Sequence, residues 1–191
     1  MILTGKITEA FNWALIFHGG AKRKGTSIPY LSHLMAVASI VMEYTSDEDV
    51  VIAALLHDAA EDAGGKATLE NIRHHFGDRV AQIVDDCSDT FETPKPDYRP
   101  RKAAYVAGLK DKQSDSQLVS LADKVHNMRS ILRDYRMSQE ELWKRFNADR
   151  DTILWHYDEL LAAFRNINHP KHKALVDELE RDLNALKELI A

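Results

Sequence analysis

The sequence is poor in the features that mark several familiar classes of protein. It has a single cysteine, Cys87, among 191 residues, so no disulfide can form within the chain, and such usage suits a reducing compartment. No apolar run approaches the roughly 20 residues that a membrane-spanning helix needs. The N-terminal segment has an acid at Glu9 and an amphipathic pattern, unlike a signal peptide. We therefore expect a soluble, cytoplasmic protein with no membrane partner.

An excess of positive charge and the signals of β-structure are also missing. The formal net charge is -5 and the Lys and Arg residues are scattered, which argues against sequence-independent binding to nucleic acid. No strand alternation exceeds a few residues, and no hairpin signal or internal repeat is present. Apolar residues instead recur every three to four positions, and 45% of the chain is hydrophobic. We predict an all-α, single-domain helical bundle over residues 1–191, whose oligomeric state the sequence leaves open.

Capping and turn residues divide this pattern into helices. In the first half of the chain we expect helices from Thr4 or Gly5 to Gly19, from Pro29 past Met42, from Ser46 to Gly64 and from Thr68 to Phe76, and another that includes Val80 and ends at about Asp86. Further helices should begin at Arg101, run from Ser114 to Ile131, and run from Leu175 to Ile190. Ser138 and Glu141 form a capping-box pattern, which predicts one long helix through Phe164 that ends before Pro170. Three prolines within 88–100 predict an exposed loop there.

The stretch Val50–Gly65 has the most unusual pattern in the chain. Every residue from Val50 to Leu56 is apolar, so a helix there should be buried on all sides. It is followed at once by polar residues, which on a continuous helix would share one face: His57, Asp58, Glu61 and Asp62. Carboxylates are disfavoured at the C-terminal end of a helix, and the stretch contains no Lys or Arg before Lys66 to offset them. Imidazole and carboxylate groups at a buried helix end suit a divalent metal ion, whereas a solvated helix end is the ordinary alternative.

Three separated segments together resemble a known family. They are PYLSH at Pro29–His33, LLHDAAED at Leu55–Asp62 and SLADKVHNMR at Ser120–Arg129. In this order they resemble the HD-domain metal phosphohydrolases, in particular the (p)ppGpp hydrolase half of the RelA/SpoT family and its stand-alone small alarmone hydrolases. The resemblance runs from about Phe11 to Ser130 and implies an HD-type helical bundle.

The resemblance assigns a role to individual residues. It implies four metal ligands: His33, His57, Asp58 and Asp123. Two imidazoles and two carboxylates suit Mn²⁺, with iron, zinc or magnesium as alternatives. Glu61 and Asp62 match the family's catalytic acids, which would orient and deprotonate a water molecule or manage the proton of the leaving group. Arg23 and Lys24 match the pair beside the guanine, and Asn127 and Ser130 match positions near the ribose and the phosphates.

The implied reaction is hydrolysis of the 3′-pyrophosphate of ppGpp or pppGpp. The loop between Arg23 and Pro29 is one residue longer than the family's usual spacing, which leaves other nucleotide substrates open, such as an adenine alarmone or NADPH. The basic run Lys22–Lys24 also has a simpler interpretation as a solvated loop. A non-catalytic module that binds an alarmone is a further alternative, although all four ligand positions and both acids are intact. Arg101 and Lys102, after the proline-rich loop, are candidates to reach phosphates.

Overall fold

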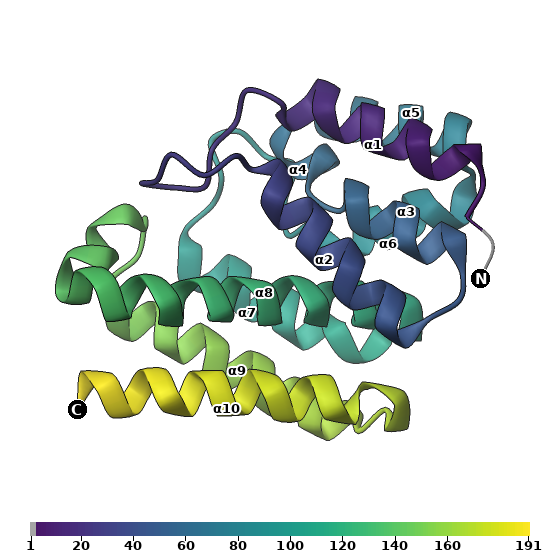
Figure 1. The fold of residues 1–191 in the computed structure, drawn as a ribbon. Coiled ribbons are helices and arrows are strands. Elements are labelled where there is room, and N and C mark those ends of the chain that lie inside the picture. The colour runs from purple at the N-terminus through teal and green to yellow at the C-terminus, as the bar shows by residue number, and fades with distance from the viewer. Residues whose placement is uncertain (1–2) are drawn as a thin grey trace. The chain divides into compact units, whose positions relative to one another are not determined.

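The computed structural model describes residues 3–191, which fold as α-helices joined by short 3₁₀ turns and loops (Figure 1). The prediction of an all-α fold is confirmed. In the described part of the chain, the only β-type pairing is an isolated bridge between Lys22 and Pro29. The helices group into two compact units, one reaching to Pro96 with Lys112–Ser120 added, the other comprising Asp97–Asp111 and Leu121–Ala191. No helix within residues 3–191 has the length and apolarity required to cross a bilayer.

The first unit is built around one buried helix. It contains α1 (Gly5–His18), α2 (Leu31–Tyr44), α3 (Glu48–Leu56), α4 (Ala59–Asp62), α5 (Lys66–Phe76), α6 (Asp78–Cys87) and the start of α8 (Ser114–Ser138). The prediction of burial on all sides is confirmed for α3, since every residue from Val50 to Leu56 is at most 5% exposed. Its neighbours are α1, α2 and α6. The apolar run thus fixes α3 in the core and holds its C-terminal end in place.

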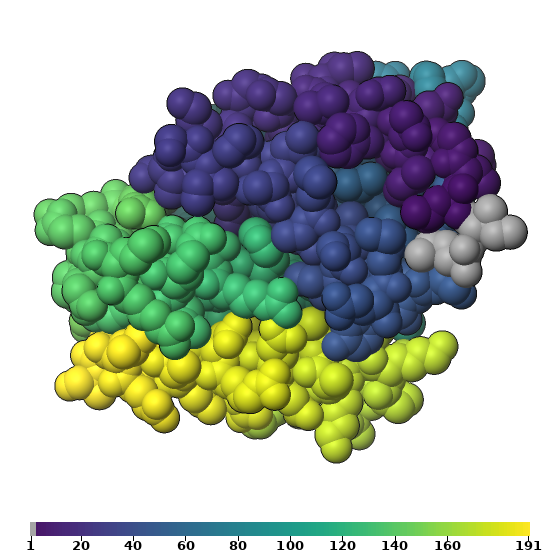
Figure 2. All heavy atoms as spheres, in the orientation of Figure 1, coloured from purple at the N-terminus to yellow at the C-terminus, as the bar shows by residue number. Residues whose placement is uncertain are grey.

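The second unit comprises α7 (Tyr98–Gly108), the remainder of α8, α9 (Arg150–Ile167) and α10 (Lys173–Ile190). α9 packs against both α7 and α10. The predicted apolar stripe of the last helix is buried, from Leu175 to Leu186. α10 supplies the yellow atoms visible in Figure 2. The assignment of residues 1–191 to one domain stays a prediction.

Several predicted helix boundaries are wrong by a few residues. Asp47, and not Ser46, caps α3, since its carboxylate accepts the Asp49 N–H at 3.0 Å. α5 begins at Lys66 and not at Thr68, whose hydroxyl donates back to the Ala63 carbonyl. α7 begins at Tyr98, before the predicted Arg101, and Pro100 lies in its first turn, where the missing N–H costs little.

The long helix predicted from Ser138 through Phe164 is also wrong. The Ser138 hydroxyl donates back to the Asp134 carbonyl at 2.8 Å, so it belongs to the end of α8. The next residue, Gln139, has φ 49° and starts a 3₁₀ segment, Gln139–Arg145. α9 then begins anew after Asp149, whose carboxylate accepts the Thr152 N–H at 2.7 Å.

Candidate metal centre

His57 and Asp58 lie where α3 gives way to α4. The sequence predicted one continuous helix here, but the chain makes a turn at these two residues and α4 is a single helical turn. The cause is local: His57 Nδ1 lies 2.8 Å from the Ala54 carbonyl oxygen, which the Asp58 N–H would use in a continuous helix. The four polar residues of the stretch therefore belong to a turn and a short helix, not to one helical face.

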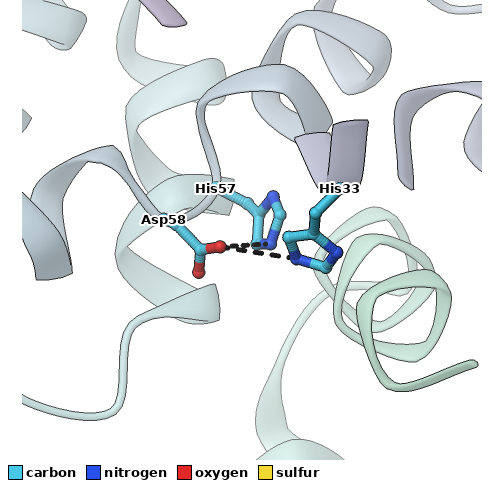
Figure 3. Close-up of side chains that lie close together, drawn as sticks. All are labelled: His33, His57 and Asp58. Atoms are coloured by element: carbon cyan, nitrogen blue, oxygen red, sulfur yellow. Dashed lines mark ion pairs between the residues drawn. The ribbon is translucent and has the colours of Figure 1, made fainter. Parts of the chain in front are cut away.

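The turn brings two imidazoles and one carboxylate together (Figure 3). Asp58 Oδ2 lies 3.1 Å from His57 Nε2 and 3.5 Å from His33 Nε2, which projects from α2. The ligand atoms of these three residues all lie within 4.8 Å of one another. Both imidazoles are at most 2% exposed. No other group of this kind occurs within residues 3–191.

This donor set fits a divalent metal ion. Because a carbonyl oxygen can only accept, His57 Nδ1 carries the hydrogen and the neutral ring presents a lone pair at Nε2. In metal-binding histidines, the ring N–H that faces away from the metal usually donates a hydrogen bond of this kind, which orients the ring. Two imidazole nitrogens and a carboxylate oxygen are ligands that zinc, manganese and iron share.

Glu61 and Asp62 follow in α4, but their surroundings differ. Glu61 Oε1 lies 2.6 Å from Lys95 Nζ, and Oε2 accepts the Asp89 N–H at 3.1 Å. Asp62 lies farther from the lysine, at 3.9 Å. Burial, together with repulsion from Asp58 and Glu61, raises the pKa of Asp62 to about 6. Glu61 is thus fixed by an ammonium and an amide, whereas Asp62 can exchange a proton near neutral pH.

The basic loop, which contains Lys22–Lys24 and lies between α1 and α2, is ordered by its own backbone hydrogen bonds. The Arg23 N–H donates to the Ile28 carbonyl at 2.8 Å, and the Tyr30 N–H donates to the Ala21 carbonyl at 2.9 Å. The Arg23 guanidinium lies 5.5 Å from the centre of the Tyr30 ring. Lys24, next to Arg23, is exposed. The loop is therefore held by its own backbone pairing and leads directly into α2, while most of its side chains are exposed.

The remaining predicted site residues lie on α8 in the second unit. The Asp123 carboxylate accepts from Asn127 Nδ2 at 2.5 Å and pairs with Lys124 Nζ at 2.5 Å. Lys124 is largely buried beside the Tyr105 ring; burial alone would lower its pKa, but the Asp123 carboxylate outweighs that effect and the pKa is raised. The Ser130 hydroxyl donates to the His126 carbonyl at 3.0 Å. The roles of these residues stay predictions.

Two neighbours of the cluster were missed from the sequence. The Tyr30 hydroxyl donates to Asp58 Oδ2 at 2.6 Å, and its position three residues before His33 could have indicated this. Lys95 contacts Glu61 across 34 residues from a proline-rich loop, for which no periodic signal exists. His18, the last residue of α1, is buried with its ring stacked on Tyr30.

Comparison with known proteins defines the class first. Residues 10–154 match the HD domain family, and the chain belongs to that family. Within it, the chain is related to the hydrolase domain of SpoT and MESH1. It is 34% identical to the human guanosine-3′,5′-bis(diphosphate) 3′-pyrophosphohydrolase MESH1 over 67% of this chain and 70% of that protein. The predicted resemblance is thereby confirmed.

A larger relative and two solved structures agree with this placement. The chain is 31% identical to a GTP pyrophosphokinase of Streptomyces coelicolor over 95% of its own length, but spans only 24% of that protein. A solved structure described as a metazoan ortholog of SpoT that hydrolyzes ppGpp covers 95% of this chain with a TM-score of 0.75 at 24% identity. A crystal structure of lmo0812 from Listeria monocytogenes covers 83% with a TM-score of 0.66 at 26% identity. These similarities confirm the HD-type fold.

Proposed function

We propose that this protein is a metal-dependent hydrolase that removes the 3′-pyrophosphate from ppGpp or pppGpp. The reaction consumes one water molecule and yields pyrophosphate with GDP or GTP. The observation that carries the proposal is the cluster that His33 of the PYLSH segment forms with His57 and Asp58 of the HDAAED segment, in an HD-type fold. Support comes also from the human MESH1 relative, which is named for this reaction and matches two thirds of the chain.

The proposed ligands are His33, His57 and Asp58, with Asp123 added on the resemblance of the LADKVHN segment. We propose Mn²⁺ as the ion, because a mixed nitrogen and oxygen ligand set of four suits it and catalytic zinc usually has three protein ligands. The bound ion would lower the pKa of a water molecule and polarise a phosphoryl oxygen.

Glu61 and Asp62 would then orient the water molecule and transfer its proton. Glu61, held by Lys95 and the Asp89 N–H, would orient the attacking water. Asp62, with its pKa of about 6, would exchange a proton with the water or with the leaving pyrophosphate. We propose that Arg23 and Lys24 bind the nucleotide base or ribose, and that Asn127 and Ser130 lie near the ribose and phosphates.

One assay tests the proposal directly. Purified protein with Mn²⁺ is incubated with ppGpp, ppApp and NADPH, and the products are separated by chromatography. We expect the highest kcat/KM with ppGpp and the release of pyrophosphate together with GDP. Preferential turnover of ppApp or NADPH would replace the substrate but keep the reaction class, whereas binding without turnover of any nucleotide would indicate a sensing module.

A further inference from the structure

Tyr30 contacts the atom on which the candidate metal centre converges. Its hydroxyl donates to Asp58 Oδ2 at 2.6 Å, and this is the same oxygen that faces His57 Nε2 and His33 Nε2. A carboxylate oxygen has two lone pairs, so it can accept from Tyr30 and still offer the other to a cation. Hydrogen bonds of this kind orient the carboxylates that bind metals.

The ring of Tyr30 is fixed by neighbours from two other segments. The His18 imidazole stacks on it with centroids 5.0 Å apart and an interplanar angle of 19°. The Arg23 guanidinium also lies over the ring, and the His33 imidazole meets it edge-on at 5.5 Å. These three contacts fix the plane of the Tyr30 ring.

The backbone of Tyr30 also closes the basic loop. Its N–H donates to the Ala21 carbonyl, and the bridge between Lys22 and Pro29 pairs the two arms of the loop next to it. Thr26 adds a hydroxyl that donates to the Arg23 carbonyl at 2.8 Å and accepts the Ile28 N–H at 3.1 Å. A displacement of Tyr30 would therefore alter the positions of both the Asp58 carboxylate and the Arg23 side chain.

We infer that Tyr30 is a positioning residue with two tasks: its hydroxyl aims Asp58 at the metal ion, and its ring holds the loop that carries Arg23. The inference rests on the metal site of the proposed function, but not on the identity of the nucleotide. It separates the two tasks chemically, because Tyr30→Phe removes the hydroxyl and keeps the ring, whereas Tyr30→Leu removes both.

The test is calorimetric titration of metal-free protein with Mn²⁺ in the absence of nucleotide. We expect Tyr30→Phe to bind Mn²⁺ about 10- to 100-fold more weakly than the wild type. Its metal-free melting temperature should stay within about 5 °C of the wild-type value, as for the loss of one hydrogen bond. The matched control is Tyr135→Phe, which removes a similar hydroxyl-to-carboxylate bond, 2.8 Å to Glu140, and should leave Mn²⁺ affinity unchanged.

Hydrogen exchange of residues 21–30 tests the second task. Tyr30→Phe should keep the wild-type protection of the Arg23 and Tyr30 amides, and Tyr30→Leu should lose it. Wild-type Mn²⁺ affinity in Tyr30→Phe would overturn the positioning role. Unchanged protection in Tyr30→Leu would overturn the loop-holding role. A wild type that binds Mn²⁺ but hydrolyses no alarmone refutes the proposed reaction, while the comparison of Tyr30 variants still decides this inference.

Discussion

The surroundings of Asp62 in α4 give its carboxyl group a pKa that differs from that of an unfolded aspartate. Burial and the neighbouring carboxylates of Asp58 and Glu61 raise its pKa to about 6, whereas an unfolded aspartate titrates near 3.8. A raised pKa means that the ionised form is disfavoured in the folded state. The stability that protonated Asp62 contributes is therefore fully present below about pH 3.8 and is lost as the pH rises through about 6.

We predict that Asp62→Asn stabilises the metal-free protein at pH 7.5 more than at pH 5. The side chain is 40% exposed, so solvent screening reduces the gain to about 1 kcal/mol. Urea unfolding of chelator-treated protein at the two pH values measures the difference. The control is Asp151→Asn, the same substitution at an aspartate whose side chain is 81% exposed. Equal gains at both pH values would contradict the raised pKa.

Glu61 allows binding to be separated from chemistry. On the proposed mechanism Glu61 is not a ligand, so Glu61→Gln should keep the metal and the nucleotide while kcat falls by roughly two decades or more. Metal analysis, nucleotide titration and steady-state kinetics measure the three quantities. Glu61 also pairs with the Lys95 ammonium and accepts the Asp89 N–H. Lys95→Met is therefore the control, because it removes the ion pair with Lys95 and keeps the Glu61 carboxylate. Metal lost together with activity would make Glu61 a ligand.

At the scale of residues, the sequence predicts which side chains bind a metal ion better than it predicts which other side chains contact them. His57, Asp58 and His33 were predicted as partners from motif resemblance, and the structure brings them together. The hydroxyl of Tyr30 and the ammonium of Lys95 reach their carboxylates across 28 and 34 residues. Contacts of that range depend on how elements pack, which periodicity within one helix does not encode.

At the scale of elements, the apolar stripes predicted the helices and the capping residues misled at their ends. α6 and α10 follow their stripes because burial of an apolar face dominates over local propensity. The ends of α8 and α3 depend on one side chain each, the Ser138 hydroxyl and the His57 imidazole, which take backbone carbonyls. Such choices differ by about 1 kcal/mol, too little for a residue pattern to decide.

The basic loop is the element whose role is most open to experiment. If Arg23 and Lys24 bind the base or ribose, the Arg23→Ala/Lys24→Ala variant should raise KM about 10-fold or more and shift the ratio of kcat/KM for ppGpp over ppApp, since a charge-assisted hydrogen bond contributes about 1.5–3 kcal/mol. Parallel kinetics with both nucleotides measure the shift.

The control for this variant is Arg101→Ala/Lys102→Ala on α7. Both cations lie within 6 Å of the Tyr98 ring, where Arg101 Cζ is 5.6 Å and Lys102 Nζ 5.8 Å from its centre. If they bind phosphates, their loss should raise KM for both nucleotides alike and leave the base ratio unchanged. A wild-type kcat/KM and base ratio in the Arg23→Ala/Lys24→Ala variant would return the loop to simple surface charge.

At the scale of the whole molecule, the helical class follows from composition and period, but the division into two compact units does not. Each unit takes segments from separate parts of the chain, and α8 contributes to both. Noncontiguous units arise from packing between distant segments. The boundary at Pro96 falls in the predicted proline-rich loop, but no sequence signal marks the return of Lys112–Ser120 to the first unit. The HD-type fold was inferred only because three separated motifs agree, which is information beyond physical periodicity.

Metal removal should destabilise the protein measurably. A ligand that binds only the folded state stabilises it by RT ln(1 + [L]/Kd), which is about 2.7 kcal/mol at a 100-fold excess over Kd. For a chain of this size we expect chelation to lower the melting temperature by about 5–10 °C, restored by Mn²⁺. His57→Ala and Asp58→Ala should lose bound Mn²⁺, activity and this restoration together.

Asp123 gives the sharpest form of this test, because its place among the ligands rests on resemblance alone. If Asp123 is a ligand, Asp123→Ala should abolish the Mn²⁺-dependent rise in melting temperature, as His57→Ala does. The same substitution leaves the buried Lys124 ammonium without its carboxylate, which lowers the melting temperature of the metal-free protein as well. Asp123→Ala/Lys124→Met removes that buried charge, and scanning calorimetry with and without Mn²⁺ then isolates the metal term. A full Mn²⁺ response in the double variant would remove Asp123 from the ligand set and leave His33, His57 and Asp58 as the protein's contribution.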